Sequence, residues 1–246
     1  MQPYLNGLIE RMSDLTLIEV EKKAEYAWRD EVTQLWIAHC EAKQLKNAEF
    51  LPDLFAFVKI EEDLFKKMHG YKIIGFLSKN CNSSEAISFL MKQLSKEKEQ
   101  YSLTTILDAL GAVYKPIELD LTPIYKLTKH KNGLVRTHAC GALTNSGQSI
   151  EPFLLDRIRN IVDKDTFENV HLLGAIMYVG TNKAIPVIEP YLISERPEIK
   201  EAATHAIGTI MLRGGASIKE TCSKTKFSIS VLKSLKRQLP DLTRQG

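Results

Sequence analysis

Histidine is the side chain most able to act as a general base or a metal ligand near neutral pH. The chain contains six histidines. Three of them, His69, His138 and His171, stand at one position of an internal repeat, and Thr105 and Ala202 fill that position in the other copies. Equivalent positions on packed helices lie about 10 Å apart, too far for two imidazoles to share a metal ion without further ligands. We interpret these histidines first as polar packing groups, second as partner contacts, and last as metal-binding or acid–base groups.

Other residue types that carry chemistry show no catalytic or metal-binding spacing. Cys40, Cys81, Cys140 and Cys222 lie far apart and form no CxxC pair, so we expect small apolar groups or unreactive thiols. The sequence has no His-Glu dipeptide and none of the motifs GxxxxGKS/T, GxSxG or GxGxxG. We therefore expect no enzymatic activity, no catalytic residue, no metal and no cofactor.

The composition is that of an ordinary soluble protein. The 246 residues are 44% hydrophobic and 26% charged, which suits one large domain or a stack of small units. A net charge of +3 creates no strong overall field that would attract a polyanion, although the residues from Gly215 onward carry seven Lys or Arg against Glu220 and Asp241. The N-terminus lacks a signal-peptide pattern, and no apolar run approaches the roughly 18 residues of a membrane span. We expect a cytoplasmic protein.

An internal repeat predicts the architecture. The segments NGLVRTHACGALTNS (132–146) and RPEIKEAATHAIGTIM (196–211) place apolar side chains at the same helical offsets. An amphipathic segment precedes each such helix, and a weaker copy lies around Ile73. Two helices within a period in the low thirties are the signature of an α-solenoid. A small residue, which lets the two helices of a pair approach closely, recurs at spacings of 33, 33 and 31 residues, at Ala109, Ala142, Ala175 and Ala206.

The repeat resembles the HEAT family. The dipeptides Val135–Arg136 and Ile199–Lys200 match the aliphatic and basic residues that open the family's second helix, and Pro123 and Pro186 stand near the place of the proline in its first helix. The resemblance covers roughly residues 48–214, and it implies a shape rather than an activity. In the other three copies, the basic position is occupied by Lys67, Leu103 and Asn169.

We predict an all-α fold, a right-handed α-solenoid of about five HEAT-like helix pairs with helical caps at both ends. Residues 1–47 form the N-terminal cap, with Ser13 as the N-cap of a long helical stretch. Residues 215–246 form a basic C-terminal cap helix and tail, with a short helix over 227–238. One face of the N-terminal cap helix is expected to carry Trp28, Val32, Leu35 and Trp36. The repeats are expected at 48–82, 83–116, 117–147, 148–181 and 182–214.

The second helices of a HEAT-like stack line its concave face, which predicts a binding surface. The offsets opposite the apolar stripe hold a mixed, partly apolar set with few charges, and Lys79 and Lys115 lie toward one edge. A nucleic-acid groove would instead show repeated Lys or Arg. The predicted partner-binding residues are Met68, Lys72, Thr104, Asp108, Thr137, Gly141, Val170, Gly174, Glu201 and His205.

These expectations favour a monomeric module that clasps one partner protein on its concave face. The small size of the chain suits an inhibitor or immunity protein that neutralises a toxin domain. The alternatives are an adaptor or assembly factor, or a HEAT-like nucleic-acid-binding protein or DNA glycosylase. Similarity to those glycosylases would require Trp and Asp in the middle repeats, whereas both Trp residues of this chain precede residue 37. Nucleic acid and membrane are therefore not the expected partners.

Overall fold

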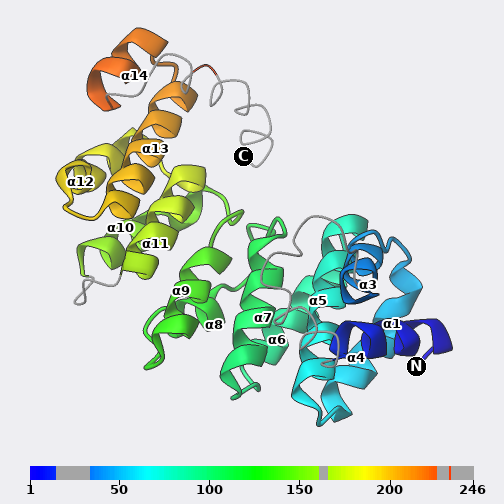
Figure 1. Cartoon of the computed structure of the whole chain (residues 1–246). Helices are drawn as coiled ribbons and strands as arrows, with labels where there is room; N and C mark the ends of the chain where they lie inside the picture. Colours follow the sequence, from blue (N-terminus) through cyan, green and yellow to red (C-terminus); the bar gives the residue numbers. More distant parts are fainter. Residues whose placement is uncertain (15–33, 161–165, 226–232, 234–246) are drawn as a thin grey trace, which may run out of the picture. The chain divides into compact units, whose positions relative to one another are not determined.

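The computed structural model describes residues 1–14, 34–160, 166–225 and 233 (Figure 1). Every regular element in these residues is helical, and they contain no β-strand. The prediction of an all-α fold is therefore confirmed. None of the helices in this described part of the chain combines the length and the apolarity that a membrane crossing requires.

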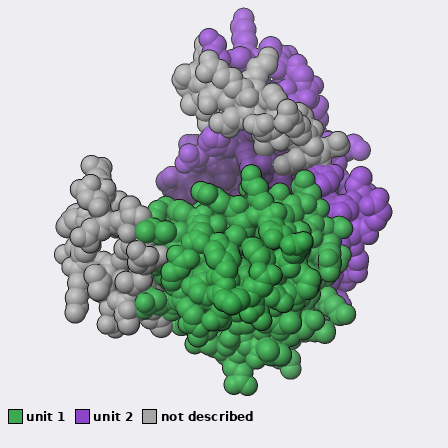
Figure 2. All heavy atoms as spheres, turned by 90° about the vertical axis from the view of Figure 1, so that its right-hand side faces the viewer, with its two compact units in different colours: residues 1–113 green, residues 114–246 purple. Residues whose placement is uncertain are grey.

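The chain divides into two compact units, residues 1–113 and residues 114–246 (Figure 2). The division falls close to the expected boundary between the second and third repeats, at residue 116. Each unit has its own buried apolar core.

Unit 1 contains an N-terminal helical part followed by two helix pairs, α4 with α5 and α6 with α7. Helix α1 packs on α3 and α5, each first helix packs on its second, and α5 packs along α7 (Figure 1). The elements in chain order are α1 (Pro3–Ser13), α3 (Gln34–Lys43), η1 (Ala48–Phe50), α4 (Leu51–Ile60), α5 (Leu64–Cys81), α6 (Ser84–Leu94) and α7 (Gln100–Gly111).

Side-chain caps fix where these helices begin and end. The Asp63 carboxylate accepts the backbone N–H of Lys66 at 2.9 Å and caps α5. That helix ends at Asn82, whose φ of 50° is left-handed, and the Ser83 hydroxyl then caps α6. Polar residues at the N-cap and a left-handed C-cap satisfy the terminal backbone groups, so two helices can follow each other with a very short turn.

Small residues bring the second helices of unit 1 into close contact. A Cβ atom added at Gly75 on α5 would lie 2.5 Å from the Cβ of Ala109 on α7. The alanine column therefore serves, at this position, the contact between second helices of successive repeats. The repeat pattern predicts instead that these alanines lie where the two helices of one pair meet.

Unit 2 contains three helix pairs: α8 with α9, α10 with α11, and α12 plus η4 with α13. The second helices α9, α11 and α13 lie side by side in that order, and α14 packs on α13 (Figure 1). The elements are α8 (Thr122–Leu127), α9 (Gly133–Ala142), η2 (Gln148–Ile150), α10 (Glu151–Arg159), α11 (Thr166–Val179), η3 (Asn182–Ala184), α12 (Ile185–Ile188), η4 (Glu189–Ile193), α13 (Pro197–Arg213) and α14 (Ile218–Thr225).

Two features of the sequence repeat have a visible structural role. Pro123 and Pro186 both stand in the first turn of a first helix, where the missing N–H costs no hydrogen bond. At the basic position, Lys67 pairs with Glu97 at 2.9 Å and Arg136 pairs with Glu168 at 3.1 Å. In each case, the cation of one repeat meets a carboxylate of the next.

The N-terminal cap differs from its prediction. Ser13 is the last residue of α1 rather than an N-cap, because Pro3 starts that helix earlier and Asp14 has left the helical region. Trp36 lies on α3 with 55% of its surface exposed. Two other residues of the predicted cap face, Trp28 and Val32, lie outside the described residues. The same holds for the helix expected over 227–238, of which only Lys233 is described. Helix α14, by contrast, was not predicted.

Candidate functional site

The exposed side of α11 is the most promising surface of unit 2. Phe167, Val170, His171 and Gly174 follow each other at helical spacing, and all four are at least partly exposed. The opposite side of the helix is buried through Leu172, Ala175 and Ile176. We call the four exposed residues the α11 face.

The space above the α11 face changes along the helix. A Cβ atom added at Gly174 would meet nothing within 4 Å, whereas one added at Gly141 on α9 would lie 3.3 Å from Cδ2 of His171. The Nδ1 atom of His171 lies 2.8 Å from the carbonyl oxygen of Phe167. His171 therefore lies against the neighbouring helix, while the surface around Gly174 is open to a partner's side chains.

The ten predicted partner-binding residues fall into three groups by burial. Asp108 and Glu201 are exposed, and two are buried, Thr104 at 6% and Thr137 at 7% exposure. The prediction that these two threonines line a binding surface is wrong; the Thr104 hydroxyl donates to the carbonyl of Tyr101 in its own helix. The partly exposed residues are Met68, Lys72, Gly141, Val170, Gly174 and His205.

The charged members of the set already interact with neighbouring groups. His205 lies 3.8 Å from Glu201, one helical turn away. Burial lowers the pKa of Lys72, and the Asp108 carboxylate opposes that shift. Burial, together with Lys72 and His39, lowers the pKa of His69 to about 4, so His69 is neutral at physiological pH.

Lys115 does not lie at the edge where the sequence placed it. Its side chain is buried, with 1% exposure, and its Nζ donates to the carbonyl oxygen of Thr144 at 2.7 Å. Burial lowers the pKa of Lys115 to about 7. Lys115 therefore binds a backbone carbonyl just after the end of α9. Lys79, by contrast, is exposed as expected.

Sequence reasoning missed a set of exposed apolar residues at the starts of the second helices. Each is the second residue of its helix, and their exposed fractions lie between 43% and 72%. Apolar side chains that remain exposed at one repeat position are candidates for partner contacts. Their regular spacing was available in the sequence, one residue before the aliphatic position. They are Phe65, Tyr101, Leu134 and Phe167.

No cluster of ligands accompanies these surfaces. In the parts of the chain that the structure describes, no three His, Cys, Asp or Glu side chains are arranged to hold a metal ion. The four cysteines all carry free thiols, and Cys140 is buried as an apolar group.

A scan of the chain against protein-family models and a search of curated proteins both found no match.

Proposed function

We propose that this chain is a right-handed, HEAT-like α-solenoid that binds one partner protein through the exposed side of its second helices and catalyses no reaction. The arrangement is supported by the two helix pairs of unit 1, the three of unit 2, and the contacts between successive second helices inside each unit. Repeated helix pairs that bury one stripe leave the other side of each second helix for binding.

The α11 face is the observation that carries the binding proposal. Phe167 is 72% exposed, Val170 is partly exposed, and Gly174 has open space above it. An apolar side chain beside a small residue suits the close approach of another polypeptide, and aromatic anchors contribute strongly to protein interfaces.

The charge around this face favours protein over nucleic acid. The α11 face carries no Lys or Arg, and the neighbouring helix α13 exposes Glu198 and Glu201 together with Lys200. Nucleic-acid affinity comes mainly from repeated phosphate contacts with cations, and a surface of mixed sign provides few of these.

The role that we propose first is inhibition of a toxin domain by a cytoplasmic, monomeric immunity protein, with an adaptor or assembly factor as the alternative. A chain with only five helix pairs is small, which suits binding one compact domain better than organising a large assembly. The partner's own activity separates the two roles, because an inhibitor abolishes that activity in the complex and an adaptor leaves it intact.

The test is affinity capture from the native source with the wild-type chain and two matched double variants. Val170→Glu with Gly174→Arg puts bulk and opposite charges into the α11 face. Gln148→Glu with Ser149→Arg puts the same charges on the exposed η2 turn. A protein that is enriched by the wild type and the η2 variant, and lost with the α11 variant, supports the proposal. Equal capture by all three chains contradicts it.

A further inference from the structure

The outward side of unit 2 is built from the same positions of its three second helices. The α11 face consists of the second, fifth, sixth and ninth residues of α11, and helical spacing puts the same positions of α9 and α13 on the same side. The three helices lie side by side. All of these residues except buried Thr137 are at least partly exposed, and we call the exposed ones the unit 2 face. Beyond the α11 face, they are Leu134, His138 and Gly141 on α9, and Glu198, Glu201, Ala202 and His205 on α13.

The carboxylates of the unit 2 face all lie on α13. They are Glu198 and Glu201, which are both exposed and stand one helical turn apart, and no residue of the unit 2 face is Lys or Arg. The α9 and α11 parts instead hold the exposed apolar side chains of Leu134 and Phe167 and the partly exposed Val170. The unit 2 face is therefore apolar over two helices and negatively charged on the third.

Both carboxylates are open to a partner's cation. Glu198 forms no hydrogen bond or ion pair with any residue that the structure describes. Glu201 lies 3.8 Å from Nε2 of His205, and 73% of the Glu201 side chain remains exposed. A cation that approached α13 from the outward side could reach both glutamates without displacing a strong internal ion pair.

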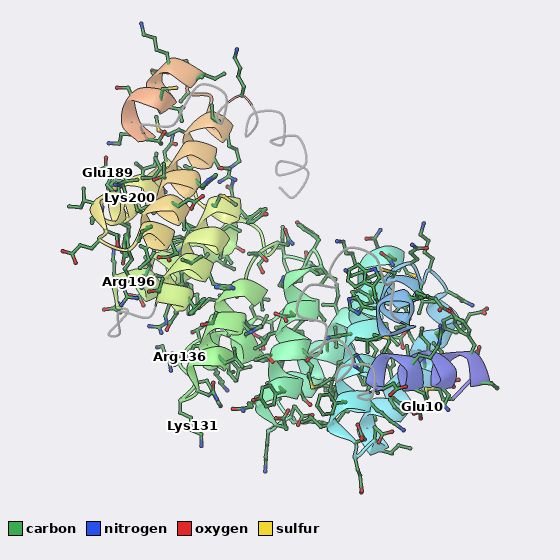
Figure 3. All side chains as sticks on the ribbon, viewed as in Figure 1. Glu10, Lys131, Arg136, Glu189, Arg196 and Lys200 are labelled. Carbon is green, nitrogen blue, oxygen red and sulfur yellow. The ribbon has the colours of Figure 1, made fainter. Side chains whose placement is uncertain are left out.

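The exposed cation of α13 lies on another side of this helix. Lys200 stands two residues from Glu198, which corresponds to about 200° around the helix axis. The same position of α9 holds Arg136, whose Nε donates to Glu168 of the next repeat at 3.1 Å. Figure 3 shows Lys200 on the side of α13 where Glu189 of η4 lies. Lys200 is therefore directed away from the unit 2 face.

The distribution of charge indicates what kind of segment complements this surface. Val170 and Glu201 are the fifth residues of adjacent helices, and equivalent positions of packed helices lie about 10 Å apart. An apolar side chain on Val170 and a cation at Glu201 satisfy both parts of the surface. An acidic segment or a phosphate backbone would meet like charges, which weakens binding and selects against such partners.

We propose that the unit 2 face recognises a protein segment in which a Lys or Arg lies about 10 Å from an exposed apolar side chain. The cation pairs with Glu198 and Glu201, and the apolar side chain packs on Val170 in the open space above Gly174. The inference rests on the proposed function, since it names the chemistry of the partner segment that reaches the α11 face.

Fluorescence anisotropy with the full chain and short labelled peptides tests both parts of this recognition. The probe is a peptide of alternating lysine and leucine. One counterpart replaces every lysine by glutamine, and the other replaces every leucine by serine. The lysine–leucine peptide is expected to bind most tightly of the three, and its affinity should fall as salt is added, because ion pairs at an exposed surface are screened.

Two matched double variants locate the charge recognition. Glu198→Gln with Glu201→Gln removes both carboxylates at nearly constant size and is expected to weaken binding of the lysine–leucine peptide about fivefold, the scale of two partly screened ion pairs. The control Glu62→Gln with Glu118→Gln removes the same charge from exposed positions outside the unit 2 face and should leave the affinity unchanged. Circular dichroism verifies that both variants are folded.

Three results would overturn this inference: no binding of the lysine–leucine peptide, an equal loss of affinity in both double variants, or equal affinity for the lysine and glutamine peptides. If any of these occurs while partner capture still depends on Val170 and Gly174, only the charge recognition fails. If the peptides behave as expected and no captured protein depends on the α11 face, the proposed function fails instead.

Discussion

Two glycines in second helices respond differently to the same substitution, because their surroundings differ. An added Cβ at Gly75 would lie 2.5 Å from Cβ and 3.2 Å from Cα of Ala109, which is a contact between two helix backbones. An added Cβ at Gly174 would meet nothing within 4 Å. We expect Gly75→Ala to destabilise the protein and Gly174→Ala to stabilise it.

The magnitude follows from two opposing effects. Alanine is favoured over glycine in a helix interior by about 1 kcal/mol, and at Gly174 this gain is not offset by a clash. At Gly75, α5 and α7 must separate to admit the methyl group, and overpacking of this kind costs about 1–3 kcal/mol. The net loss for Gly75→Ala is then about 1 kcal/mol, so the two variants differ by roughly 2 kcal/mol.

Urea unfolding followed by far-UV circular dichroism measures this difference from the transition midpoints. Both changes add the same methyl group, so their common effect on the unfolded chain cancels. The swap Gly75→Ala with Ala109→Gly restores the space between the helices, and it should recover most of the lost stability. Equal stabilisation by Gly75→Ala and Gly174→Ala would refute the close contact between α5 and α7.

Three further predictions concern the stability of the folded chain. Ala142→Leu and Ala175→Leu should each lower the free energy of unfolding by about 1–3 kcal/mol through overpacking, because both alanines are at most 1% exposed. Unchanged melting temperatures in both variants would reject the repeat register. Arg136→Met removes one of the two guanidiniums that contact buried Glu168 and should cost about 2 kcal/mol in urea unfolding. The control Lys131→Met, at an exposed position, should change stability by less than about 0.5 kcal/mol. Lys115 has a folded pKa of about 7, below its unfolded value of 10.5, so the unfolded state binds more protons between these values and stability should rise with pH across this window. Lys115→Met should show a smaller rise over pH 7 to 10 when unfolding is measured at several pH values, and an identical slope would show that Lys115 is charged when folded.

Local patterns were sufficient to predict the helix pairs between residues 48 and 214, although not α1 or α14. The apolar stripe of α13 from Ile199 to Ile210 and that of α11 through Leu172 and Ile176 are both buried as their periodicity predicts, because helical spacing decides which side chains share one face. The first-turn position of Pro123 and Pro186 also follows from local chemistry, since proline lacks the N–H that an interior helix position requires.

Whether a side chain is exposed could not be derived in the same way, because exposure depends on residues that are distant in the sequence. Thr104, Thr137 and Lys115 occupy positions that helical spacing assigns to the outward side or to an edge, yet all three are buried. Gly141 and Gly174 occupy the same repeat position, but only Gly141 has a neighbouring histidine ring above it.

The sequence by itself determined the helical repeat, the apolar stripes and the small residues, because these depend on the spacing of residues within one or two helices. Only the tertiary structure decided that the chain forms two compact units, that Arg136 and Arg157 converge on Glu168, and that Phe167 remains exposed. Arg136, Arg157 and Glu168 come from three different helices. Their meeting depends on how those helices pack in three dimensions, which no periodicity within a single helix encodes.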